Sequence, residues 1–188
     1  MNNDKKFLTA YFANFKNLIN DEVIDQILIL KKLIKNLGKK NKILIAGNGG
    51  SAAISSHFSV DITKNAKIRA VNFNEYDLIT CFSNDYGYER WIEKAIEYYC
   101  EKGDMLILIS SSGQSPNMIK AGKFFKKRRF GKLITLTGHK NNNNLKKIGD
   151  LNLWVNSKSY NLIENIHQFW LLSVIDLIIG KSEYSPNR

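Results

Sequence analysis

The sequence predicts an α/β protein in which helices cover both faces of a parallel, doubly wound sheet. Residues 105–109 are apolar without interruption, which is typical of a strand buried on both faces in a parallel sheet. Similar apolar runs alternate with helical patterns along the chain. Such alternation is typical of a three-layer αβα sandwich with right-handed connections.

Spacing of the apolar residues predicts the individual elements. Apolar positions recur at helical spacing in some segments, while short β-branched runs mark strands in others. We expect strands at residues 43–47, 68–73, 104–109, 133–137 and 151–155. We expect helices at residues 4–19, 21–38, 75–82, 88–101 and 161–179, with Gly38 as the C-cap of the second.

These elements divide the chain into three parts. Residues 1–38 form a helical extension, which packs either on its own domain or at a subunit interface. Residues 39–181 form the α/β domain, and residues 182–188 form a polar, loose tail. A length of 188 residues suits one domain with a full hydrophobic core.

Composition limits the partners that we expect. The net charge is +11, but the lysines are scattered, and the cluster Lys126–Arg129 ends a predicted helix, where cations complement the helix dipole. We therefore do not expect a nucleic-acid partner. Cys81 and Cys100 are too few for a disulfide framework and lack metal-type spacing. No signal peptide or membrane span is recognisable, so we expect a cytoplasmic protein without membrane association.

A glycine-rich turn, Gly47–Ser51, follows the first predicted strand and leads directly into a helical pattern. Glycines let the backbone approach a ligand closely, and the free N–H groups and dipole of a helix start favour phosphate. The alternative is an ordinary strand-to-helix turn that binds nothing. The turn by itself does not predict an anion site; other features of the sequence must support it.

A second loop, Ser110–Asn117, follows the buried strand. Ser115 is the expected N-cap and Pro116 the first helical residue, so the loop brings hydroxyl and N–H groups together at a helix start. Its serines can hydrogen-bond phosphate oxygens without charge repulsion. Because both loops lie at the carboxyl ends of parallel strands, we expect them to form one ligand site.

Other polar residues are candidates for chemistry. His57 and Asp61 share a face of the helix that follows the first loop, where they could move a proton, hold a metal, or form only a surface pair. Glu164 and His167 lie three residues apart on the apolar last helix and need partners or have shifted pKa values. By composition, Asn84–Gly87 is only a turn at a helix end.

Together, these motifs resemble a known family. The residues that carry the resemblance are Gly47–Ala53, His57–Phe58, Asn84–Gly87, Ser110–Asn117 and Leu136–Gly138. Over about residues 40–180 the chain resembles the phosphoheptose isomerases of the sugar isomerase (SIS) fold. Members of this family convert a ketoheptose 7-phosphate into the aldoheptose phosphate through an enediol, for lipopolysaccharide or capsule. They are homotetramers with sites at subunit interfaces.

The resemblance implies roles for individual residues. It assigns the substrate phosphate to Ser110, Ser111, Ser112 and Ser115. It assigns the sugar chain to Asn48, Gly49, Ser51, Asn84, Asp85 and Glu164. The helix after the first loop is then expected to bring the carboxylate of Asp61 toward the reacting carbons.

The sequence departs from the family at the catalytic positions. Asp61 replaces a Glu, Glu164 replaces a Gln, and Leu172 replaces a His, so the family's acid/base pair and its four-ligand zinc site are both incomplete. The catalytic candidates are Asp61 and Glu164, assisted by His57 or His167. The metal candidates are His57, Asp61 and Glu164, and no organic cofactor is expected. The alternative is a sugar-phosphate-binding or protein-interaction module without catalysis.

Overall fold

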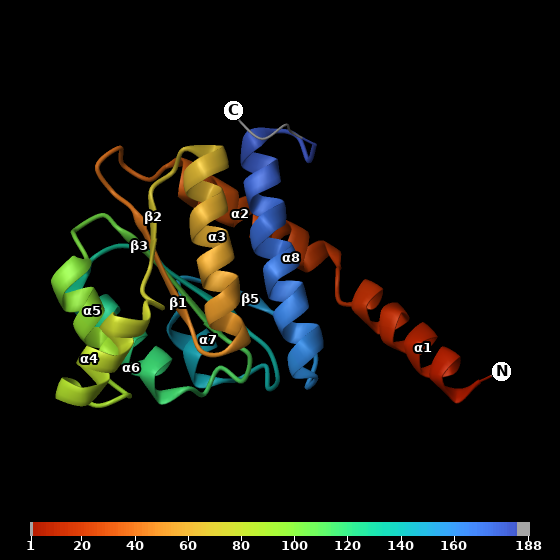
Figure 1. Cartoon of the computed structure of the whole chain (residues 1–188). Helices are drawn as coiled ribbons and strands as arrows, with labels where there is room; N and C mark the ends of the chain where they lie inside the picture. The colour runs from red at the N-terminus through yellow and green to blue at the C-terminus, as the bar shows by residue number, and fades with distance from the viewer. Residues whose placement is uncertain (1, 184–188) are drawn as a thin grey trace.

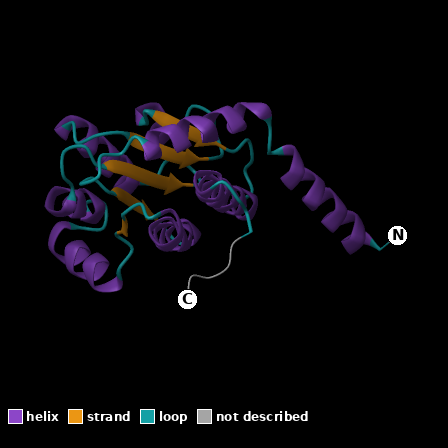
Figure 2. Ribbon diagram, turned by 90° about the horizontal axis from the view of Figure 1, so that it is seen from above, coloured by secondary structure: helices purple, strands orange, loops and turns teal. Residues whose placement is uncertain are grey.

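The computed structural model describes residues 2–183 and confirms the predicted three-layer architecture (Figures 1 and 2). Within these residues the sheet has five parallel strands in the order β2-β1-β3-β4-β5. The strands are β1 (Ile43–Gly47), β2 (Ala70–Asn72), β3 (Met105–Ser110), β4 (Leu133–Thr137) and β5 (Leu151–Trp154). The helices are α1 (Asn3–Asn17), α2 (Asp21–Lys35), α3 (Gly50–Ala66), α4 (Tyr76–Tyr86), α5 (Trp91–Tyr99), α6 (Pro116–Arg128), α7 (Asn144–Ile148) and α8 (Tyr160–Ile179).

The strand order places the two predicted loops side by side. β1 pairs with β2 on one side and with β3 on the other, so the direction of winding reverses between β1 and β3. Gly47, the last residue of β1, lies opposite Ile109 near the end of β3. The loops after these two strands therefore open at the same switch point of the sheet, where open α/β sheets bind ligands.

Side chains of the central strands point alternately into two separate cores. On β1, Ile43 and Ile45 pack in a cluster with α2, α3 and α8, whereas Leu44 and Ala46 pack in a second cluster with α5 and α6. The two groups of helices lie on opposite faces of the sheet (Figures 1 and 2). Burial of every β1 residue explains why this strand has no polar face.

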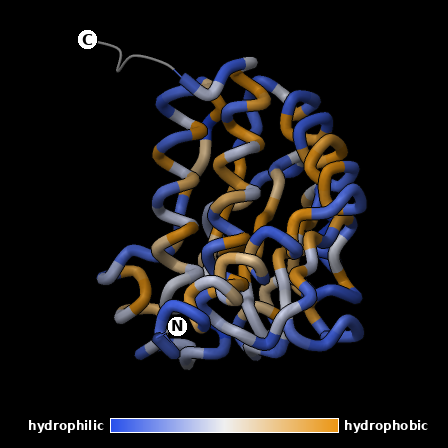
Figure 3. Tube along the Cα trace, turned by 90° about the vertical axis from the view of Figure 1, so that its right-hand side faces the viewer, coloured by the Kyte–Doolittle hydropathy of each residue, from blue (hydrophilic) through white to orange (hydrophobic). Residues whose placement is uncertain are grey.

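The two N-terminal helices behave differently. α2 packs against α8 and β5 and buries Val23, Leu30 and Ile34, so it belongs to the domain. α1 buries no residue and extends away from the body (Figures 1 and 2). Its Phe7 and Phe12 are each 65% exposed. Along the long helices, hydrophobic and hydrophilic residues alternate as amphipathic helices require (Figure 3).

Three predicted helix boundaries are wrong. The helix expected at residues 75–82 extends to Tyr86 as α4, so Asn84, Asp85 and Tyr86 are helical and only Gly87 lies in the expected turn. The other two helices are shorter than expected. α2 ends at Lys35 rather than at Gly38, because Asn36 is its C-cap and donates its N–H to the carbonyls of Lys32 and Ile34. The helix expected from residue 88 begins at Trp91, because a turn closed by the Arg90 N–H and the Gly87 carbonyl precedes it. In both places the periodic pattern continues through a turn.

The last helix, α8, is a core helix. Its length and apolar composition would also suit a membrane crossing. In the fold, however, Trp170, Leu171 and Val174 are buried against the sheet and the helices α2 and α3. Burial inside the domain therefore accounts for its apolar composition.

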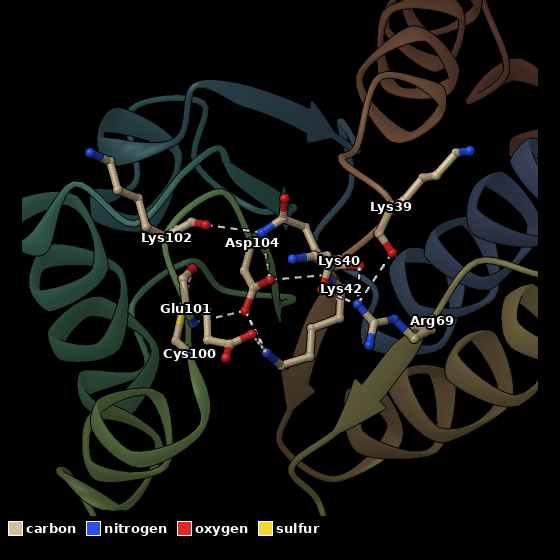
Figure 4. A network of polar contacts seen from close by, with 9 residues as sticks. Lys39, Lys40, Lys42, Arg69, Cys100, Glu101, Lys102 and Asp104 are labelled. Atoms are coloured by element: carbon tan, nitrogen blue, oxygen red, sulfur yellow. Dashed lines mark hydrogen bonds and ion pairs between the residues drawn. The ribbon is translucent and has the colours of Figure 1, made fainter.

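A buried carboxylate joins the amino ends of β1 and β3 (Figure 4). The Asp104 side chain is fully buried and accepts hydrogen bonds from the Lys42 N–H at 2.9 Å, the Lys42 Nζ at 2.8 Å and the Glu101 N–H at 2.9 Å. Burial by itself raises the pKa of Asp104, but these donors outweigh it and hold the pKa below its usual value.

We predict that Asp104→Asn destabilises the protein by about 3 kcal/mol at pH 7, because it leaves the Lys42 ammonium without its buried partner. A carboxyl whose pKa is lower in the folded state stabilises the fold above its unfolded pKa of about 3.9, and this contribution is lost as the pH falls further. Urea unfolding at several pH values measures the difference. A difference between wild type and variant that stays constant from neutral pH to below pH 3 would contradict this assignment.

Candidate active site

The first loop is shaped by glycines and by one asparagine from another segment. The Asn74 side chain accepts from the Gly47 N–H at 3.1 Å and donates to the Gly47 carbonyl at 2.7 Å, so it continues the sheet pairing beyond β2. A Cβ atom at Gly47 would lie 2.4 Å from the Ser51 backbone. Gly49, with φ of 56°, is the N-cap of α3 and provides no capping side chain.

The second loop folds on its own serines. Ser110 Oγ and Ser115 Oγ lie 3.0 Å apart, and Ser112 Oγ accepts from the Gln114 N–H at 3.2 Å. Ser115 is the N-cap of α6, with Pro116 following, as predicted. Gly113 turns the loop with φ of 64°. The loop therefore presents several hydroxyl groups at the start of α6.

Asn143 supports this loop from behind. It is fully buried and donates to the carbonyls of Lys140 and Gly138. A Cβ atom at Gly113 would lie 2.0 Å from Asn143 Oδ1, so Asn143 can occupy this position only because residue 113 is a glycine. Asn143 also caps α7 by accepting from the Lys146 N–H at 2.9 Å. Within the asparagine run 141–144, this residue therefore has a structural role.

An amide pair connects the two loops. Asn48 Nδ2 donates to Asn117 Oδ1 at 3.1 Å, and Asn117 Nδ2 donates to Asn48 Oδ1 at 2.9 Å. The Tyr88 hydroxyl also donates to Asn48 Oδ1, at 3.2 Å. The side chain of Asn117 is buried, so the reciprocal pair holds the first residue after β1 against the first turn of α6.

A pocket of about 130 Å³ opens between the loops and α8. It is lined by Asn48, Ser51, Ile109, Ser110, Ser111, Ser112, Ser115, Tyr160 and Glu164. Ser111 Oγ is buried and has no hydrogen-bond partner in residues 2–183. A buried hydroxyl without a partner costs about 1–3 kcal/mol, which a bound anion would recover. The structure therefore brings six of the predicted substrate-binding residues and Glu164 into one site. We call it the serine pocket.

Glu164 enters the serine pocket from α8. Its carboxylate lies against the first turn of α3, since a Cβ atom at Gly50 would meet Glu164 Oε2 at 2.2 Å. A carboxylate is favourable there, because the helix N-terminus carries a partial positive charge and Gly49 does not cap it. A side chain at position 50 would therefore displace the Glu164 carboxylate from this place.

The expectation that α3 brings Asp61 to the serine pocket of its own chain is not met. Asp61 lies ten residues beyond Ser51 on α3, which is about 15 Å along the helix axis. Its Oδ2 is 3.2 Å from His57 Nε2, and Gln168 Nε2 from α8 lies 3.3 Å from His57 Nδ1. Burial and then the negative charge of Asp61 raise the pKa of Asp176. The His57–Asp61 pair therefore faces the far part of α8.

His167 has a structural role, which the sequence left undecided. It is fully buried, and its Nε2 lies 3.1 Å from the Thr137 carbonyl, so this nitrogen carries the proton. Burial lowers the pKa of His167 to about 4, and the hydrogen bond to Thr137 only partly opposes this effect. His167 does not line the serine pocket, so assistance to catalysis by this residue is not supported.

Three predicted residues do not line the serine pocket. Asn84 and Asp85 end α4 and bond to each other, with Asn84 Nδ2 to Asp85 Oδ1 at 2.9 Å. Gly49 acts through the backbone as the N-cap of α3. Sequence reasoning missed Tyr160, because an aromatic residue before an apolar helix resembles an ordinary core residue. It lines the pocket and packs on His139 with ring centroids 4.9 Å apart.

The donor set of one chain does not fit a zinc ion. His57 and Asp61 are adjacent, but Leu172 has no donor atom, and Glu164 lies toward the opposite end of α3. In residues 2–183, no three His, Cys, Asp or Glu side chains group in a way that could hold a metal. The family's four-ligand arrangement is therefore absent from a single described chain.

Fold and site together define a class of protein. The class consists of doubly wound α/β proteins with a ligand pocket at the switch point of the sheet. Here the pocket is lined by serine hydroxyl groups beside a helix N-terminus, which are groups that suit a phosphate.

Comparison with known proteins identifies the family. The SIS domain family matches residues 9–138. A phosphoheptose isomerase of Aliarcobacter butzleri is 35% identical over 155 residues, which cover 79% of this chain and 80% of that protein. One from Helicobacter pylori is 34% identical over 182 residues, which cover 93% of this chain and 92% of that protein. The chain belongs to the phosphoheptose isomerase family of SIS-domain proteins, as the resemblance indicated.

A solved structure agrees with this assignment. Phosphoheptose isomerase GmhA from Neisseria gonorrhoeae superimposes with a TM-score of 0.84 at 27% identity. The match covers 94% of this chain and 98% of that chain. This chain therefore shares the fold of nearly the whole of that isomerase chain.

We predict that His167 makes the fold sensitive to mild acid. Its pKa is lower in the folded than in the unfolded state, so the unfolded chain binds the proton first and stability falls as the pH drops below about 6.5. Between pH 7 and 4.5 the loss of unfolding free energy due to His167 is about 2–3 kcal/mol. Urea unfolding of wild type and His167→Gln at both pH values measures it. Equal pH dependence of the two proteins would show that His167 is not held neutral.

Proposed function

We propose that the protein is a phosphoheptose isomerase, which interconverts sedoheptulose 7-phosphate and D-glycero-D-manno-heptose 7-phosphate. The observation that carries this proposal is the serine pocket at the switch point, with the Glu164 carboxylate inside it, in a chain of this family. A relative that matches more than nine-tenths of the chain is a phosphoheptose isomerase, which supports the same reaction.

The serine pocket suits the phosphate end of the substrate. Ser110, Ser111, Ser112 and Ser115 offer hydroxyl groups beside the N-terminus of α6, whose free N–H groups favour an anion. The phosphate lies at C7, far from the reacting carbons C1 and C2. Its binding energy can therefore be used to orient the sugar chain for reaction.

The reaction requires only proton transfers. A base removes a proton from C1 of the ketose, and the electron pair forms a C1–C2 double bond while the C2 carbonyl oxygen takes up a proton. The enediol then gains a proton at C2 and loses one from the C1 hydroxyl, which leaves the aldehyde. No electrons leave the sugar, so we propose that no organic cofactor takes part.

Glu164 is our candidate for the base of this reaction, because it is the carboxylate that lines the serine pocket and it comes from α8, across the pocket from the serine loop. This role requires the sugar chain to run from the serines toward α8, so that C1 reaches the carboxylate. Asp61 is the second candidate. It cannot reach the pocket of its own chain, but a second copy could bring its His57–Asp61 pair to the pocket mouth. The side chain of His57 is 46% exposed, as such a contact requires.

We further propose that the protein is a homotetramer with sites between subunits. The serine pocket of one chain, at about 130 Å³, is smaller than the about 300–1,000 Å³ of usual small-molecule sites. Large apolar side chains are exposed on α1, α2, α3 and α8. They are Phe7, Phe12, Ile24, Leu28, Val60 and Phe169. Exposed apolar side chains on the projecting helix α1 and on the body favour association with another copy, which would bury them.

The same proposal includes a place in metabolism. We place the reaction in the cytoplasm, in the supply of heptose for lipopolysaccharide or capsule, as the family resemblance implies. Cys81 and Cys100 are both free thiols, which agrees with a reducing compartment.

The reaction is tested by incubating the protein with sedoheptulose 7-phosphate in deuterated water and following C1 and C2 by NMR. We expect deuterium incorporation and aldose product. Glu164→Gln should lower kcat by about 100- to 10,000-fold, because it removes general base catalysis while preserving side-chain size. Saturable binding without deuterium uptake or product would instead indicate a sugar-phosphate-binding module.

A subunit-mixing experiment separates the two carboxylates. If the site combines Glu164 of one copy with Asp61 of another, co-expressing Glu164→Gln and Asp61→Asn chains restores activity, because some interfaces receive both wild-type residues. If both residues served one chain's site, every site in the mixture would carry one defect. Mixtures no more active than the separate variants would therefore contradict a shared interface site.

A further inference from the structure

A second cavity lies near the amino ends of the strands, whereas the serine pocket lies at their carboxyl ends. It has a volume of about 640 Å³, within the usual range for small-molecule sites. It lies before the start of β1, and β1 is five residues long, so about 15 Å separates it from the serine pocket. It is lined by Ile34, Lys35, Leu37, Gly38, Lys39, Asn41, Ala66, Lys67, Ile68, Arg69 and Ile178. We call it the basic cavity.

The charges around the basic cavity are not balanced. Lys35, Lys39, Lys67 and Arg69 line it, and no Asp or Glu does. Within residues 2–183, none of these four cations forms an ion pair. The neighbouring Lys42 differs, because its ammonium bonds to two carboxylates (Figure 4).

Helix dipoles do not neutralise these cations. The C-termini of α2, α3 and α8 meet near the cavity, at Lys35, Ala66 and Ile179. Each helix end contributes about half a negative charge, so the three together supply about −1.5 against four positive charges. An excess of about 2.5 positive charges remains, which suits a phosphate or diphosphate group.

Arg69 is held in place at the edge of the cavity. Its Nη2 donates to the carbonyls of Lys39 at 3.4 Å and Asn41 at 3.3 Å, and also to that of Lys40. Figure 4 shows the guanidinium beside this loop, with the Lys39 ammonium pointing away from Asp104. The loop that precedes β1 and the start of β2 therefore keep two cations at one rim.

The other side of the cavity is aliphatic. It consists of Ile34, Leu37, Ala66, Ile68 and Ile178. A basic rim beside an apolar wall suits an anion that also carries an apolar group, rather than a free inorganic ion. We propose that the basic cavity binds a nucleoside diphosphate, with its phosphates on the lysine and arginine side chains and its base on the aliphatic wall. This site is independent of the isomerase site.

The probe for this proposal is ADP, titrated into the full-length protein by isothermal calorimetry. We expect saturable binding with one site per chain. The double variant Lys35→Ala/Lys67→Ala should weaken it about tenfold or more, because it removes charge-assisted contacts to phosphate. Adenosine and inorganic phosphate, which each lack half of the recognised chemistry, should each bind at least about tenfold more weakly than ADP.

Two matched variants serve as controls. Lys123→Ala/Lys127→Ala removes the same charge from α6, outside the cavity, and should change ADP affinity less than about twofold. Ser115→Ala alters the serine pocket and should leave ADP affinity unchanged. Absence of saturable ADP binding, equal weakening by both lysine double variants, or loss of binding only in Ser115→Ala would each overturn the proposal.

Discussion

The reciprocal amide pair between Asn48 and Asn117 is the interaction on which the site depends. It joins the first residue after β1 to the first turn of α6, at 3.1 and 2.9 Å. Each loop is shaped locally, by Gly47 in one and by Gly113 against Asn143 in the other. The amide pair then converts two separate strand-to-helix turns into the walls of one pocket. Because the Asn117 side chain is buried, its amide must keep its partner.

The parallel packing of α3 and α8 decides which residues can act together in one chain. Glu164 lies level with Gly50 at the start of α3, whereas Gln168 lies level with His57 further along. Residues ten positions apart on α3 are therefore separated by about 15 Å, and no rotamer change can bring Asp61 to the serines of its own chain. The two positions to which the family resemblance assigns catalysis, Asp61 and Glu164, are therefore far apart in one chain. This separation is the physical reason for our interface proposal.

The sequence was sufficient for the fold and for most of the pocket lining. Apolar runs and glycine turns identified all five strands, and the rule that ligands bind at strand carboxyl ends joined Ser110–Ser115 to Asn48 and Ser51. It could not place Asp61 or His167. Helical periodicity assigns a residue to a face, but the level at which two helices pack depends on tertiary contacts far apart in sequence. The role of Asn143 was hidden as well, because Gly113, which packs against it, lies 30 residues earlier in the chain.

We propose that the Asn48–Asn117 pair holds the two loops together as one substrate site. A double-mutant cycle with Asn48→Ala and Asn117→Ala, read out as affinity for sedoheptulose 7-phosphate, tests it most directly. We predict a coupling energy of about 1–2 kcal/mol, so that the double variant loses clearly less affinity than the two single losses combined. Losses that add within about 0.5 kcal/mol would contradict the claim, because the loops would then bind independently.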